Sequence, residues 1–294
     1  MISFNKPTLA GNELKNILCN HQNFQFAGDG YYNELCGNFL TKTIRCSKSM
    51  LTHSCTAALE MCAILTDIKS GDEIIMPSYT FVSTANAFVL KGGVPVFVDI
   101  DPDTFNIDPN LVEEVISSKT RAIVLVHYAG VGCEMNQILD IAKKYNLFVV
   151  EDAAQGIMAK YKGQALGSFG DLGCLSFHET KNIHCGEGGA LLINNEKFID
   201  RAEIIRDKGT NRSQFFRGQV DKYRWVDIGS SYLPGELTAA FLFAQLEKAH
   251  EITADRLSIW NKYYEIFEDL EKSEKVRRPI IPDYCEHNGH IFHL

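Results

Sequence analysis

The chain has 294 residues, of which 45% are hydrophobic, so it can bury a sizeable core as one large domain with part of a second, or as two modest domains. Its net charge of -8 argues against a general nucleic-acid surface or an anionic-membrane surface, because both need clustered lysine and arginine. No apolar run is long enough to span a bilayer.

Short apolar runs alternate with helical patterns in the first half of the chain. The runs are rich in β-branched residues, which is typical of strands buried on both faces of a sheet. They occupy residues 73–77, 94–98, 122–126 and 147–150. Apolar residues recur at helical spacing over 56–65 and 135–145. This alternation predicts βαβ units and a mostly parallel sheet with helices on both faces.

Two more predicted strands, residues 172–177 and 190–193, enclose a loop that contains Lys181. The polar stretch 208–222 is the best candidate for a long functional loop.

The last part of the chain changes character. Residues 237–270 have a long helical pattern with few breakers, and residues 289–294 look like the start of a further strand.

Lys181 lies in a setting that is typical of pyridoxal 5′-phosphate (PLP) enzymes. It follows an apolar strand, and the glycine-rich stretch 186–189 follows it. Asp152 ends an earlier strand, at the carboxyl edge where ligands bind in open α/β sheets. A lysine can form a Schiff base with the aldehyde of PLP, and a carboxylate can keep the pyridine nitrogen protonated. Taken alone, Asp152 is more often a helix N-cap, and the glycines can be only a hairpin turn.

Other segments supply residue types that such a ligand needs. The stretch 54–56 opens a predicted helix, whose N–H groups and hydroxyls form an anion site for the phosphate, helped by Ser176. Gln155 can donate to the phenolic oxygen of the ring, and Phe81 can stack on the ring. The plainer interpretations are an ordinary helix cap, a surface glutamine and a core aromatic.

The cysteines and histidines do not indicate a metal site. The nine cysteines show no C-x-x-C pair and no regular spacing, which predicts reduced thiols in a cytoplasmic protein. His127, His178 and His184 lack metal-ligand spacing, and no H-E-x-x-H motif occurs. We expect His178 near the cofactor, with no metal bound to it.

Taken together, these motifs resemble the DegT/DnrJ/EryC1/StrS family of sugar-nucleotide aminotransferases. The matching stretches follow the family's order over nearly the whole chain: 11–13, 54–56, 77–85, 151–155, 163–171, 176–182 and 186–189. Each stretch alone is weak, whereas the set is highly specific. The resemblance implies the aspartate-aminotransferase-like α/β fold (fold type I), PLP as cofactor, and a homodimer whose active sites draw residues from both subunits.

The resemblance also implies a role for each matched residue. Lys181 is expected to be the catalytic Schiff-base lysine, and Asp152 the partner of the pyridine nitrogen. Gln155 is expected to meet the ring oxygen and Phe81 to stack on the ring. The expected phosphate contacts are Cys55, Thr56 and Ser176.

A closer likeness lies in residues 206–225 and 227–233, to the branch of the family that makes dTDP-4-amino-4,6-dideoxygalactose for enterobacterial common antigen. It implies dTDP-4-keto-6-deoxyglucose as substrate and glutamate as amino donor. The loop is expected to contact the nucleotide sugar, across the subunit interface, through Arg212, Arg217 and Tyr223. Another keto sugar, or amination at C3, stays open. A PLP-dependent dehydratase is disfavoured, because those relatives carry His at the position of Lys181.

Members of this family continue past the length of this chain into a small domain that helps close the active site. The resemblance therefore predicts a large PLP-binding domain over residues 1–245, and a linking helix with the start of a truncated small domain over 246–294. Many relatives carry an asparagine near residue 233 that reaches the partner's phosphate, and the stretch 232–236 lacks it. An inactive fragment of the family is the alternative from another class.

Overall fold

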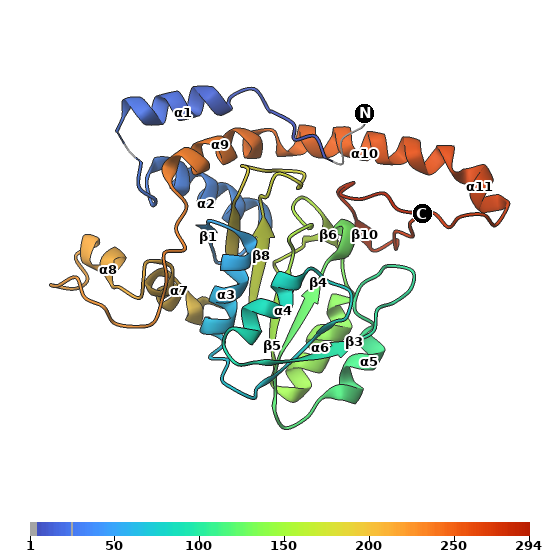
Figure 1. Cartoon of the computed structure of the whole chain (residues 1–294), viewed down its shortest axis with the longest axis horizontal. Coiled ribbons are helices and arrows are strands. Elements are labelled where there is room, and N and C mark those ends of the chain that lie inside the picture. Colours follow the sequence, from blue (N-terminus) through green and yellow to red (C-terminus); the bar gives the residue numbers. More distant parts are fainter. Residues whose placement is uncertain (1–4, 25) are drawn as a thin grey trace.

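The computed structural model describes residues 5–24 and 26–294 (Figure 1). In this part of the chain, seven strands form one sheet with the order β1-β9-β8-β5-β4-β2-β3. They are β1 (Lys48–Thr52), β2 (Glu73–Pro77), β3 (Val94–Val98), β4 (Thr120–Val126), β5 (Phe148–Asp152), β8 (Leu172–Ser176) and β9 (Gly189–Ile193). β9 runs antiparallel to β1 and β8, and all other neighbours are parallel. The prediction of a mostly parallel sheet is confirmed.

Helices cover the sheet on both faces (Figure 1). The helices of the described residues are α1 (Glu13–Gln22), α2 (Tyr31–Ile44), α3 (Cys55–Leu65), α4 (Val82–Val89), α5 (Pro109–Val112), α6 (Met135–Tyr145), α7 (Ile199–Arg206), α8 (Arg212–Phe216), α9 (Glu236–Glu247), α10 (Ala249–Ile266) and α11 (Glu268–Lys272), and not all of them contact the sheet. Single 3-10 turns occur at Glu113–Val115, Tyr128–Gly130 and Glu196–Phe198. A small sheet combines β6 (Lys160–Tyr161), β7 (Gln164–Ala165) and β10 (Cys285–Glu286).

Alternate residues of each central strand serve opposite faces of the sheet. Val124 and Val150 pack in the core with α3, α4 and α7. Ile123 and Val149 pack in the core with α6 on the other face. Because side chains alternate along a strand, a strand that is buried on both faces has a continuous apolar sequence. These strands therefore appear in the sequence as continuous apolar runs, without alternating polar residues.

The long helical pattern near the end of the chain is divided in the structure. α9 ends at Glu247, α10 follows from Ala249, and α11 starts at Glu268 after a break at Phe267. The strand that we predicted over residues 289–294 is wrong, since this stretch has no regular structure. The carbonyl groups of His290 and Ile291 accept hydrogen bonds from side chains of α10 instead of from a neighbouring strand.

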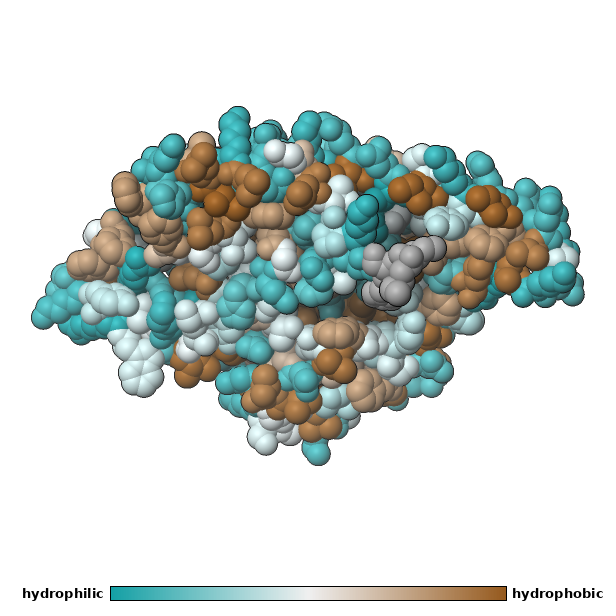
Figure 2. Space-filling view, turned by 45° about the horizontal axis from the view of Figure 1, so that its top comes forward, coloured by the Kyte–Doolittle hydropathy of each residue, from teal (hydrophilic) through white to brown (hydrophobic). Residues whose placement is uncertain are grey.

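Apolar side chains remain exposed on the helical layer of α1 and α10. Figure 2 shows brown side chains gathered along this layer at the top of the molecule. Leu14 is 80% exposed and Leu18 58% exposed on α1, and Ile266 is 69% exposed on α10. In the described ranges, no helix is long and apolar enough to cross a membrane.

Candidate active site

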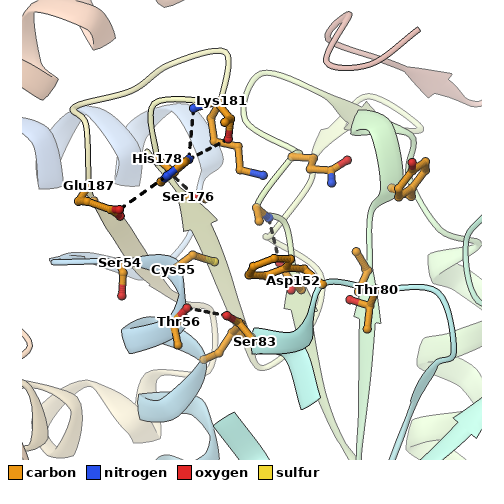
Figure 3. Close-up of a pocket in the computed structure, with 18 of the residues that line it drawn as sticks. Ser54, Cys55, Thr56, Thr80, Ser83, Asp152, Ser176, His178, Lys181 and Glu187 are labelled. Carbon is orange, nitrogen blue, oxygen red and sulfur yellow. Dashed lines mark hydrogen bonds and ion pairs between the residues drawn. The ribbon is translucent and has the colours of Figure 1, made fainter. Parts of the chain in front are cut away.

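A cavity of about 690 Å³ opens at the carboxyl edge of the central strands (Figure 3). Its lining contains every residue that the sequence nominated for the cofactor: Cys55, Thr56, Phe81, Asp152, Gln155, Ser176 and Lys181. His178, which was expected nearby, also lines it. The structure therefore brings together residues that are up to 126 positions apart, from Cys55 to Lys181.

Strand pairing and strand alternation explain this convergence. β5 and β8 are parallel neighbours, with Asp152 opposite Cys174, so their carboxyl ends meet at one edge. Asp152 lies two residues after Val150 on the strand, so both side chains are on the same face of the sheet, the face that α3 covers. Ser176 likewise lies two residues after Cys174, whose side chain packs on that face too.

The start of α3 forms one corner of the cavity. The Ser54 Oγ accepts a hydrogen bond from the N–H of Ala57 at 3.1 Å, so the helix-cap interpretation of Ser54 is right. The Thr56 and Ser83 hydroxyl oxygens lie 2.8 Å apart. A Cβ atom on Gly189 would lie 2.4 Å from the Cys55 nitrogen, so only glycine permits this close approach of β9 to the helix start. A helix N-terminus with adjacent hydroxyls suits a phosphate group.

Asp152 lies at the floor of the cavity and is only 4% exposed. Its carboxylate accepts hydrogen bonds from the Thr84 hydroxyl at 2.6 Å and from the Ala154 N–H at 3.1 Å. No helix follows, so the N-cap interpretation of Asp152 is wrong. Burial raises the pKa of the Asp152 carboxyl, even though these donors and Lys181 act in the opposite direction. A buried carboxylate of this kind is stabilised by a cationic partner such as a protonated ring nitrogen.

Lys181 lies on the connection between β8 and β9. Burial lowers the pKa of its amine, and the nearby Asp152 carboxylate offsets this only in part. Gly186 in the same connection has a φ of +82°, a conformation that favours glycine. The connection joins an antiparallel pair, so the hairpin interpretation holds, and Gly188 also lines the cavity. An amine with a lowered pKa is more often neutral and hence more nucleophilic.

Gln155 and Phe81 flank the same space. The Gln155 Oε1 accepts from the Ala129 N–H at 2.6 Å, which leaves the Nε2 hydrogens free to donate elsewhere. Phe81 is 74% exposed, so it is not a core aromatic. An exposed ring at the edge of a cavity is available for stacking on a flat ligand.

The sequence did not nominate several other lining residues. Tyr79, Thr80 and Ser83 fall inside the matching stretch 77–85, so that motif could have found them. Tyr128 follows a predicted strand, and its hydroxyl lies 3.1 Å from that of Tyr79. Burial and this contact raise the pKa of Tyr128 to about 12. No sequence signal pointed to Ile291.

The three residues that were expected to contact the sugar do not line this cavity. The Arg217 guanidinium pairs with Glu203 at 2.7 Å, and that of Arg212 with Asp207 at 3.3 Å. Tyr223 is 52% exposed. Their segment, with α8, projects away from the sheet (Figure 1). In this single chain the loop is therefore separate from the cavity.

The residues present fit PLP. The helix start at Cys55 and Thr56 suits the phosphate, and the buried Asp152 carboxylate suits the ring nitrogen. The Lys181 amine belongs to the same cavity, as Figure 3 shows, and suits the aldehyde. These groups are chemically suited to the phosphate, the ring nitrogen and the aldehyde of the cofactor. The cavity also has the size of a small-molecule site.

Known proteins resemble this chain in sequence and in fold. The model of the DegT/DnrJ/EryC1/StrS aminotransferase family matches residues 12–294. The spore coat polysaccharide biosynthesis protein SpsC of Bacillus subtilis is 34% identical over 84% of this chain. The GDP-perosamine synthase of Escherichia coli O157:H7 is 31% identical over 95% of it. This chain spans 63% of the length of SpsC and 75% of that of the synthase.

Solved structures share the fold of this chain. Spr1654 of Streptococcus pneumoniae, described as a sugar aminotransferase, has a PLP form that is 24% identical, covering 99% of this chain and 77% of Spr1654 with a TM-score of 0.88. Its PMP form gives a TM-score of 0.90. The fold is therefore the aspartate-aminotransferase-like fold type I, and PLP is the cofactor of the group. Because the family model matches residues 12–294 and the GDP-perosamine synthase is 31% identical over 95% of this chain, the chain belongs to the DegT/DnrJ/EryC1/StrS aminotransferase family.

Proposed function

We propose that this chain transfers an amino group from glutamate to C4 of a nucleotide-linked 4-keto-6-deoxy sugar. The observation that carries the proposal is the presence of Lys181, Asp152 and the start of α3 in one cavity. Products of the reaction are 2-oxoglutarate and the amino sugar. Family membership supports the reaction class.

Each residue has a defined task in this reaction. PLP, when bound, supplies the carbonyl group that receives the amino group and a ring that accepts electrons. Asp152 keeps a proton on the ring nitrogen, and the Gln155 Nε2 donates to the ring oxygen. Phe81 covers the ring and excludes water. The phosphate is held by Cys55, Thr56 and Ser176.

Lys181 moves the protons. Its neutral amine would take the proton from the α-carbon of glutamate and hold it for transfer to the bound cofactor. With the keto sugar, the same amine moves a proton in the reverse direction, to C4 of the sugar. Its lowered pKa suits this task, because the amine must accept a proton near neutral pH.

The proposed substrate is dTDP-4-keto-6-deoxyglucose, and the product dTDP-4-amino-4,6-dideoxygalactose, for a cell-surface polysaccharide. The likeness in residues 206–233 supports this choice. SpsC is named for polysaccharide synthesis, which agrees with it. The similarity to a GDP-perosamine synthase favours one second candidate, a GDP-linked keto sugar.

The proposal includes a homodimer. The loop of Arg212, Arg217 and Tyr223 lies away from the cavity of its own chain, so we propose that it contacts the sugar in the partner's site. Trp225 in the same segment is 77% exposed, which supports an interface here. The division into a large domain up to residue 245 and the beginning of a small one after it belongs to the same proposal.

Cofactor absorbance tests the proposal. The protein is incubated with PLP and freed of excess, and its visible band is recorded before and after glutamate. The band should fall with glutamate and return with dTDP-4-keto-6-deoxyglucose, whose product is identified by mass spectrometry. Lys181→Ala should not form the band, whereas the surface variant Lys162→Ala should.

Two results would contradict parts of the proposal. A band that glutamate does not change identifies an inactive fragment. A band that responds to glutamate but returns only with a GDP-linked keto sugar supports the second candidate.

A further inference from the structure

Asn288 joins segments on two sides of the cavity. Its side chain is fully buried, with 0% exposure. Its Nδ2 donates to the carbonyl oxygens of Gln155 and Ile157, both at 2.8 Å. A Cβ atom on Gly130 would lie 2.1 Å from the Asn288 Oδ1, so glycine is required there. Asn288 therefore fixes the turn that carries Gln155.

The same residue is bonded to the lysine loop. The Asn182 Nδ2 donates to the Asn288 carbonyl oxygen at 2.9 Å. The Asn182 Oδ1 lies 2.8 Å from the His290 Nδ1. An amide oxygen can only accept, so the Nδ1 of His290 carries the hydrogen and donates it. Asn182 directly follows Lys181, and its two partners hold both ends of its side-chain amide.

Helix α10 holds this segment in place. The Arg256 Nη2 donates to the His290 carbonyl at 3.1 Å, and the Trp260 Nε1 to the Ile291 carbonyl at 3.0 Å. The rings of Trp260 and His287 lie 4.4 Å apart. Ile291 lines the cavity. The segment 287–291 is thus packed between α10 and the site.

We propose that Asn288 and His290 are positioning residues of the PLP site: Asn288 fixes Gln155 against the lysine loop, and the Nδ1–H of His290 fixes Lys181 through Asn182. This inference rests on the PLP site of the proposed function and does not require transamination. A buried amide with all its partners has one orientation, because every alternative leaves a polar group unsatisfied. Lys181 and Gln155 act on atoms of one ligand, so an error in their relative position weakens binding.

The first experiment compares two asparagines. Asn288→Asp replaces the two donated hydrogen bonds with a carboxylate that faces two carbonyl oxygens. The control is Asn194→Asp, since the Asn194 Nδ2 also donates to two carbonyl oxygens, those of Gly167 and Gly170, outside the cavity lining. The dissociation constant of PLP is measured by absorbance titration, and the melting temperature without cofactor by circular dichroism. Asn288→Asp should weaken PLP binding at least about tenfold, and the control less than about twofold.

The second experiment separates the two nitrogens of His290. In His290→Asn the new amide N–H can replace the Nδ1 donor, whereas His290→Leu removes it. The readouts are the PLP dissociation constant and the pH midpoint of the visible band, which reports on Lys181. His290→Leu should change both, and His290→Asn should keep them close to those of the unchanged protein. Asn182→Ala combined with His290→Leu should have no more effect than Asn182→Ala alone, because the alanine already removes the acceptor of the His290 contact.

The inference is overturned if Asn288→Asp and Asn194→Asp lower the melting temperature equally and leave PLP binding unchanged. For His290, the inference is overturned if His290→Asn weakens PLP binding as much as His290→Leu does. That result would assign the effect to the Nε2 atom and not to Nδ1. A protein that binds PLP but does not react with glutamate refutes the proposed function, and these titrations still decide the inference.

Discussion

At the residue scale, two adjacent carboxylates in β5 have different environments. Asp152 lines the cavity, whereas Glu151 is fully buried on the opposite face. Glu151 accepts from the His127 Nε2 at 2.9 Å and from three backbone N–H groups. Those groups belong to Gly167, Phe169 and Gly170, at 2.8, 2.6 and 2.7 Å. Glu151 is therefore satisfied within the protein, and Asp152 is the carboxylate that remains available to a ligand.

Asp152→Asn tests the cost of burying the available carboxylate. Burial raises the pKa of Asp152 in the folded protein, so its contribution to stability is full at low pH and is lost as pH rises through the folded value. Above that pH the ionised group destabilises the cofactor-free fold. The Asn variant should thus melt higher, by on the order of 2 °C, and lose about a hundredfold in the rate of the glutamate reaction. Calorimetry and stopped-flow absorbance measure these effects, and a lower melting temperature contradicts the argument.

The reaction of Lys181 with PLP should depend on pH. Burial lowers the pKa of its amine from the ordinary 10.5, so the neutral form appears at lower pH than for a solvated lysine. The rate at which the visible band forms should rise with pH and reach half its maximum below 10.5. Stopped-flow mixing over a pH series gives the midpoint, with free lysine and PLP as the reference. A midpoint equal to that of the reference contradicts the role of burial.

At the element scale, Glu236 connects α9 to the start of α2. It is fully buried, and its carboxylate accepts from the N–H groups of Gly30, Tyr32 and Asn33 at 3.0, 2.7 and 3.1 Å. The Asn33 side-chain amide also donates to it. The first N–H groups of a helix have no partner within the helix, so a distant carboxylate serves as the cap.

Glu236→Ala should lower the free energy of unfolding by about 3 kcal/mol, because several buried donors lose their acceptor. Urea denaturation measures this loss. Glu247→Ala, at an exposed position of the same helix, is the control and should change it by less than about 0.5 kcal/mol. Equal losses in the two variants would mean that helix propensity, and not the cap, is responsible.

The strands that the sequence predicted are those with a continuous run of apolar residues. The runs at 73–77, 94–98 and 147–150 correspond to β2, β3 and β5. β2 and β5 are buried on both faces, whereas β3 is an edge strand with Val94 and Phe97 exposed, and its apolar, β-branched sequence still marked it. β1 was not predicted, since its sequence Lys48–Thr52 is short and begins with polar residues, and its pairing with β9 defines it. The breaks at Lys248 and Phe267 have no proline or glycine to mark them.

At the scale of the whole molecule, apolar residues remain exposed over several elements. Phe81 and Val82 are 74% and 64% exposed beside the cavity, and Trp225 77% in the loop after α8. Together with the layer of α1 and α10 in Figure 2, they are candidates for burial between subunits.

The chain should therefore sediment as a homodimer, and Trp225→Ser should weaken the dimer at least about tenfold, because large exposed aromatics dominate interface energies. Sedimentation equilibrium measures the dissociation constant. Lys275→Ser, an exposed polar position, is the control. A monomer at all concentrations, or an unchanged constant in Trp225→Ser, refutes this prediction.

The sequence by itself determined the alternation of strands and helices and the family, and it predicted the PLP chemistry that we propose for Lys181 and Asp152. These depend on local spacing and residue type, which a sequence contains directly. Only the tertiary structure decided that Asp152 and not Glu151 faces the cavity, and that Arg212 and Arg217 pair with acidic neighbours outside it. It also placed Ile291 in the cavity lining and joined Asn288 to Gln155 and Asn182. The contacts of Asn288 join segments more than a hundred residues apart, and their energies depend on burial that no local pattern records.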